Sequence, residues 1–81
     1  MKIYGYKDEG ETTEVIEPDE LAEITLVANP DELRKIARFI EAAAEGMENR
    51  PETWEHEHLS DKYPEFKGSP HFVVFNPDAS V

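Results

Sequence analysis

Hydrophobic residues near the N-terminus follow the two-residue spacing of strands. Residues 2–6 are rich in types with high sheet propensity, and residues 21–28 alternate between two faces. We therefore predict a strand in each segment, and residues 21–28 give the clearer pattern. The face expected to point toward the core carries Ala22, Ile24, Leu26 and Ala28.

The middle of the chain changes to a spacing of three and four, which predicts one amphipathic helix over about 30–48. Asn29 is suited to the N-cap, Pro30 to the first helical position, and Glu32 to closing a capping box. Pro51 prevents a long continuation. The expected buried stripe consists of Leu33, Ile36, Ala37, Ile40, Ala44 and Met47, with Phe39 and Ala43 beside it.

The last third of the chain predicts two more strands and a loop. Residues 53–60 alternate again and indicate a strand, with the polar end of a helix as the alternative. Residues 61–70 contain two prolines and a glycine, which is typical of a loop, and its two aromatic residues are expected to cover an open end of the core. Four of the five residues 71–75 are apolar and predict a final buried strand, and we expect a frayed tail over about 77–81.

This order of elements predicts a single α+β domain over residues 1–81. We expect two layers, with the helix packed on a mainly antiparallel sheet of about four strands. An acidic loop at about 7–20 would join the first two strands, unless residues 12–16 form a short strand of their own.

The charge balance restricts the partners that such a domain can have. Its 81 residues include 19 Asp and Glu against 8 Lys and Arg, so the formal net charge is −11. This charge argues against binding of nucleic acid or an anionic membrane, and it favours a partner with a basic surface. The chain has no cysteine and no apolar run long enough to span a membrane, so we expect a cytoplasmic protein.

The acidic residues are concentrated in two segments of the chain. Seven of the fourteen residues 7–20 are acidic, and three more acids lie in the second half of the predicted helix. One interpretation is a surface that attracts a basic protein partner, and the other is a solvated surface that only keeps the protein soluble. The candidate partner-binding residues are Asp8, Glu9, Glu11, Glu14, Glu41, Glu45 and Glu48.

The stretch around His56 and His58 is the strongest candidate for metal chemistry. Two histidines two positions apart on a strand share one face, and Asp61 or His71 could add a further ligand. The alternative is two ordinary histidines on a half-exposed sheet. No spacing fixes a third ligand, and no nucleophile elbow or phosphate-binding glycine loop is present. We therefore expect no metal site, no cofactor and no enzymatic activity.

Several segments, taken together, form a pattern that is less general than any one of them. They are Ile24-Thr25-Leu26, Ala28-Asn29-Pro30-Asp31-Glu32-Leu33-Arg34, Ala37, Phe39, Ala42-Ala43-Ala44-Glu45, Met47, His56-Glu57-His58-Leu59-Ser60-Asp61 and Phe72 to Phe75. In these segments the chain resembles the bacterial immunity protein family numbered thirty-two, from polymorphic toxin systems. The resemblance implies a small cytoplasmic protein that binds and neutralises a cognate toxin and has no catalytic residues. Two alternatives remain: a metal-binding protein that uses His56 and His58, or a homo-oligomeric module such as a homodimer.

Overall fold

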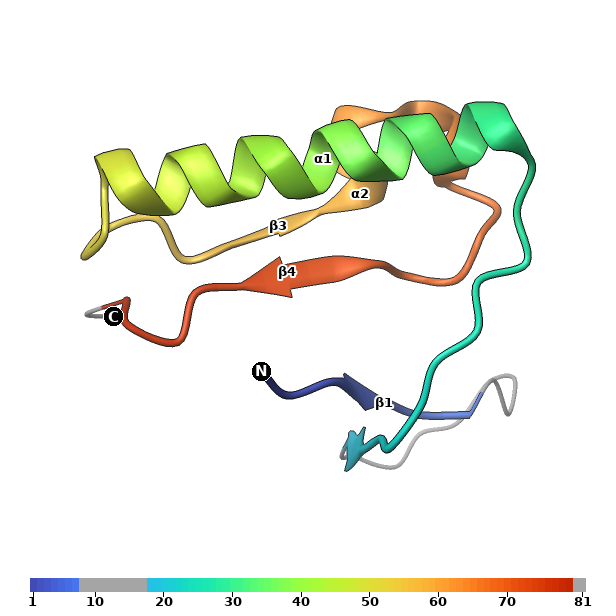
Figure 1. Cartoon of the computed structure of the whole chain (residues 1–81), viewed down its shortest axis with the longest axis horizontal. Coiled ribbons are helices and arrows are strands. Elements are labelled where there is room, and N and C mark those ends of the chain that lie inside the picture. The colour runs from blue at the N-terminus through green and yellow to red at the C-terminus, as the bar shows by residue number, and fades with distance from the viewer. Residues whose placement is uncertain (8–17, 80–81) are drawn as a thin grey trace.

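The computed structural model describes residues 1–7 and 18–79, and it has one long helix and two small antiparallel sheets (Figure 1). Most of the expected acidic loop, the alternative strand at 12–16 and the last two residues lie outside the described residues. The elements, in chain order, are β1 (Tyr4–Gly5), β2 (Asp19–Glu20), α1 (Pro30–Asn49), β3 (His56–His58), α2 (Leu59–Lys62), the 3₁₀ turn η1 (Pro64–Phe66) and β4 (Val73–Phe75).

The sheets confirm the α+β class and the antiparallel pairing. Strand β1 pairs with β2, so that Tyr4 lies opposite Glu20. Strand β3 pairs with β4, so that His56 lies opposite Phe75. Four strands are therefore present among the described residues, but they form two separate two-stranded sheets and not the single sheet expected, and α1 lies over β3 and β4 (Figure 1).

Helix α1 begins where its capping residues predict. The Asn29 side chain accepts a hydrogen bond from the backbone N–H of Glu32 at 2.8 Å, and Glu32 Oε1 accepts one from the backbone N–H of Asn29 at 2.9 Å. This reciprocal capping box satisfies two backbone donors that the first turn leaves without helical partners. The helix ends at Asn49, where the backbone N–H of Arg50 donates to the Gly46 carbonyl.

The core lies between α1, α2, η1 and the β3–β4 sheet. Phe39 is its central helical residue, with 3% of its surface exposed, and its ring meets that of Phe72 edge to face at 6.1 Å. As expected, the aromatic residues of the 61–70 segment cover the core, since Phe66 is buried and Tyr63 packs against it. The buried apolar residues are Ile36, Phe39, Ala43, Trp54, Leu59 and Phe66.

The prediction of the buried helix face was wrong. Phe39 and Ala43 are buried, whereas of the predicted stripe only Ile36 is buried and Met47 is half-buried. The apolar sector of α1 is wider than the surface that β3, β4 and α2 offer, so packing covers only one half of it. The uncovered half, here called the exposed stripe, consists of Leu33, Ala37, Ile40 and Ala44.

The strand predicted over residues 21–28 was also wrong. This segment, here called the arm, links β2 to α1 without regular secondary structure (Figure 1). Among the described residues its only backbone hydrogen bond to another segment runs from the Leu21 N–H to the Ile3 carbonyl, at 2.7 Å. Alternating residues form a strand only beside another edge, and no described strand lies along the arm.

The remaining strands are shorter than predicted. Strand β3 covers only residues 56–58 of the expected 53–60, because Leu59 turns inward and begins α2. The backbone N–H of Trp54 donates to the Arg50 carbonyl in the preceding turn. Trp54 therefore does not share a strand face with His56, but packs beneath α1.

Candidate partner-binding site

Three candidate acids form an outward face on α1. Glu41, Glu45 and Glu48 are exposed, and their spacing of three, four and seven places them on one side of the helix. None of them forms an ion pair with another described residue. This surface, here called the α1 acidic face, borders the exposed stripe.

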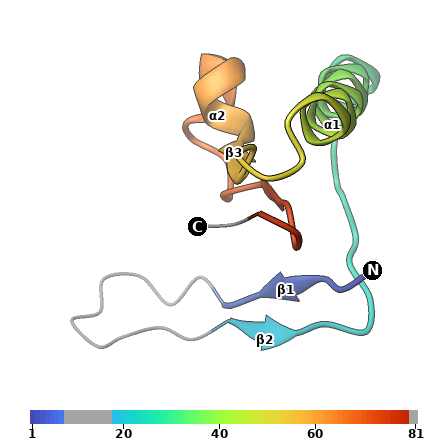
Figure 2. The same ribbon diagram turned by 90° about the vertical axis from the view of Figure 1, so that its left-hand side faces the viewer.

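The structure describes only the ends of the first acidic segment. Asp8, Glu9, Glu11 and Glu14 lie outside the described residues. The described acids of the same segment are those of β2, and β2 lies on the opposite side of the molecule from α1 (Figure 2). The role of the loop and helix acids in partner binding therefore stays a prediction.

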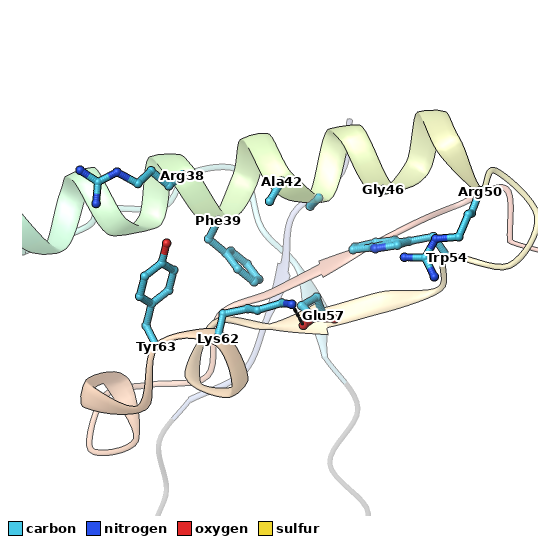
Figure 3. A pocket seen from close by; sticks show the side chains of 10 residues that line it. Arg38, Phe39, Ala42, Gly46, Arg50, Trp54, Glu57, Lys62 and Tyr63 are labelled. Atoms are coloured by element: carbon cyan, nitrogen blue, oxygen red, sulfur yellow. Dashed lines mark ion pairs between the residues drawn. The ribbon is translucent and has the colours of Figure 1, made fainter.

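A cleft with basic residues lies on one flank of α1, beside β3 and α2 (Figure 3). Its volume is about 390 Å³, and its lining includes Arg38, Arg50, Lys62 and the aromatic rings of Trp54 and Tyr63. Arg38 and Arg50 lie at opposite ends of the cleft, about 18 Å apart along the helix axis. They cannot hold one small anion together, whereas each can pair with a separate carboxylate.

The centre of this cleft is neutralised by an ion pair. Lys62 Nζ lies 3.6 Å from Glu57 Oε1, and both side chains point along the floor of the cleft (Figure 3). Neither Arg38 nor Arg50 has an acidic partner within the described chain. The helix sequence shows several bases before Glu41, but nothing in it reveals that Arg50 and Lys62 join the same surface.

Trp54 lines one end of the cleft, and the buried Asn76 holds the turn that carries it. The Asn76 side chain is buried and donates to the carbonyls of Pro51, at 3.0 Å, and Trp54, at 2.7 Å. Its Oδ1 accepts from the backbone N–H of Asp78 at 3.0 Å. These bonds tie the end of β4 to the turn that follows α1, and so they hold the indole under the helix.

The same flank of α1 carries an ionic contact with η1, one helical turn before Arg38. Lys35 donates a hydrogen bond to Glu65 and also forms an ion pair with Asp31 at 3.1 Å. Its hydrogen bond with Glu65, followed by that with Asp31, raises the pKa of the Lys35 ammonium group. The same contact lowers the pKa of the Glu65 carboxyl below its usual range.

The histidines lie on the sheet face that points away from α1. His56 stacks on Phe75 at 5.8 Å, and the ring centres of His56 and His58 are 5.5 Å apart. His58 and His71 also line a hollow shared with Tyr4 and Tyr6 at the β1 end of the molecule. Within residues 1–7 and 18–79, no group of three or more histidine or acidic side chains is placed to hold a metal ion.

Comparison with known proteins assigns the chain to a family. It matches the family model described as Immunity protein 32 over residues 23–77, about two thirds of its length. The chain therefore belongs to the immunity protein 32 family, as its sequence segments indicated. No curated protein and no solved structure matches it. Among the described residues, no helix is long and apolar enough to cross a membrane.

Proposed function

We propose that the chain is an immunity protein that binds and neutralises a cognate bacterial toxin in the cytoplasm, and that the toxin presents a basic surface. Membership of the immunity protein 32 family is the observation that carries this proposal. An immunity protein acts by binding, and we therefore propose no enzymatic activity for this chain.

The α1 acidic face supports the electrostatic part of the proposal. Glu41, Glu45 and Glu48 project from a rigid helix, and a net charge of −11 surrounds them. Such a field speeds the approach of a basic partner and pairs with its cations. We also propose the loop acids Asp8, Glu9, Glu11 and Glu14 as partner-binding residues, because their charge adds to the negative field of the chain.

The test is binding to the product of the neighbouring toxin-like gene, measured by calorimetry at two salt concentrations. We expect tight binding that weakens at higher salt, and a loss of at least about tenfold in the Glu41→Lys/Glu45→Lys variant. The Asp61→Lys/Asp78→Lys variant is the matched control, because it changes the net charge equally at exposed positions outside α1. Equal affinities for the two variants would contradict the role of the α1 acidic face, and no binding by any form would contradict the immunity function.

A further inference from the structure

Within the described part of the chain, two successive segments keep large apolar side chains exposed. The first is the exposed stripe on α1, where Leu33 and Ile40 keep 43% and 47% of their surface exposed. The second is the arm, where Ile24 and Leu26 keep 46% and 47%. Small soluble domains rarely leave several large apolar side chains uncovered on neighbouring segments, and such patches usually mark an interface.

The exposed stripe lies above a free sheet edge. The cleft occupies the flank of α1 beside β3 and α2, so the stripe faces the other flank, on the side of β4. Strand β4 pairs only with β3 among the described strands, which leaves its second edge open. A further strand on that edge would extend the sheet directly beneath the exposed stripe.

The arm has the alternating pattern that a strand on the open edge of β4 requires. Its alternation puts Ala22, Ile24 and Leu26 on one face, and Glu23, Thr25 and Val27 on the other. As a strand, residues 22–28 would span about 20 Å, and the stripe from Leu33 to Ala44 is about 17 Å long. With the apolar face of the arm against the stripe, Glu23 would point to solvent.

The accessible surface of the chain also exceeds that of a closed monomer. A compact protein of 9.3 kDa exposes about 5,000 Å², whereas this chain exposes 6,997 Å². About 700 Å² of the excess remains when the twelve undescribed residues are counted as fully exposed chain. A stable interface buries about 800 Å² on each partner, so the uncovered surface is of the size that a dimer needs.

From this complementarity we infer that two copies of the chain exchange their arms. The arm of each copy adds to the β4 edge of the other and covers the exposed stripe of its α1. The arrangement closes on itself by a two-fold axis, because each copy supplies one arm and one receiving surface. The inference does not depend on the immunity function.

Light scattering on the purified chain tests the dimer. We expect twice the chain mass of 9.3 kDa. The dimer dissociation constant should fall as the salt concentration rises, because salt screens the repulsion between two chains of charge −11. Toxin binding should show the opposite salt dependence, so the two proposals can fail separately. Ile40→Glu should raise the dimer dissociation constant at least about 100-fold, whereas Ala42→Glu on the opposite side of α1 should leave it unchanged.

Cysteine cross-linking tests the exchange itself, since the chain contains no cysteine. Two differently tagged chains, one with Leu26→Cys and one with Ile40→Cys, should form a disulfide with each other after they are unfolded and refolded together. The chain that carries both substitutions should form covalent dimers on oxidation. A disulfide within a single chain would show that the arm covers its own helix, and a wild-type monomer at millimolar concentration would overturn the inference. Cross-linking does not need the Ile40→Glu variant, so it still tests the exchange of arms if that variant fails to fold.

Discussion

Gly46 lies directly against the indole of Trp54. A Cβ atom on Gly46 would come within 2.4 Å of Trp54 Nε1 and 2.6 Å of its Cδ1. Real Cβ atoms do not approach so closely, so the buried ring or the helix would have to move. The last turns of α1 therefore reach the β3–β4 sheet only because this helical position has no side chain.

Gly46→Ala should destabilise the fold despite its better helix propensity. The gain in propensity is about 1 kcal/mol, and the clash with the buried indole costs about 2–3 kcal/mol. We expect the free energy of unfolding, measured with urea and circular dichroism, to fall by about 1–2 kcal/mol. Gly68→Ala is the control, because no atom lies within 4 Å of its Cβ position. A stability gain in Gly46→Ala would contradict the contact.

Phe39→Ala tests the corrected buried face of α1. Phe39 is 3% exposed and meets Phe72 in the core, so its truncation should cost about 3–5 kcal/mol of unfolding free energy. That loss would leave so small a domain close to unfolded at 25 °C. Arg38→Ala, one position earlier and exposed, should cost no more than about 0.5 kcal/mol. Similar losses in the two variants would mean that α1 packs through another face.

Asn76→Asp tests the buried tie between β4 and the turn after α1. The substitution replaces the amide that donates to Pro51 and Trp54 with a carboxylate that faces two carbonyl oxygens. We expect a loss of at least about 3 kcal/mol at neutral pH. Asn49→Asp, at the exposed end of α1, should cost less than about 1 kcal/mol.

The Asn76→Asp variant should also acquire a characteristic pH dependence. Its carboxyl is favoured in the protonated form in the folded state, so its folded pKa lies above its unfolded value. Stability relative to the wild type should therefore recover as the pH falls and decline as the pH rises through the folded pKa. An unchanged stability difference between pH 4 and pH 7 would contradict this account.

The contact between Lys35 and Glu65 predicts part of the acid sensitivity of the wild type. The pKa of Glu65 is lowered from its usual 4.5 by the hydrogen bond from Lys35, so the contribution of the carboxylate is present above that value and is lost as the pH falls below it. Lys35→Met should flatten the stability profile in this acidic window. Lys67→Met should not, since Lys67 forms no ion pair with any described residue. Urea unfolding at several pH values between 3 and 6 provides the comparison.

The sequence predicts local structure better than the contacts between distant segments. The start of α1 follows from Asn29, Pro30 and Glu32, because a capping box is formed by residues three positions apart. The buried face of the helix could not be chosen in the same way. Phe39 and Ile40 are both apolar, and only the position of β4 and α2 decides which of them is covered.

The difference between local structure and distant contacts also explains which parts of the candidate site could be predicted. The acids of α1 could be placed on one face from their spacing alone, since helix geometry fixes it. The cleft could not be foreseen, because Arg38, Arg50 and Lys62 come to line one surface only after the chain has turned twice. The arm shows the limit most clearly: its alternation indicates a strand, but a strand depends on a neighbouring edge that the sequence does not identify.

The position of Trp54 has a practical consequence for following this protein in solution. It is the only tryptophan of the chain. Its ring lies against the last turns of α1, and its carbonyl accepts a hydrogen bond from the Asn76 side chain. Its fluorescence therefore comes from one point, where the helix meets the sheet. An emission spectrum that shifts to the red would report that the helix end has lifted from the sheet, and this optical signal needs no added label.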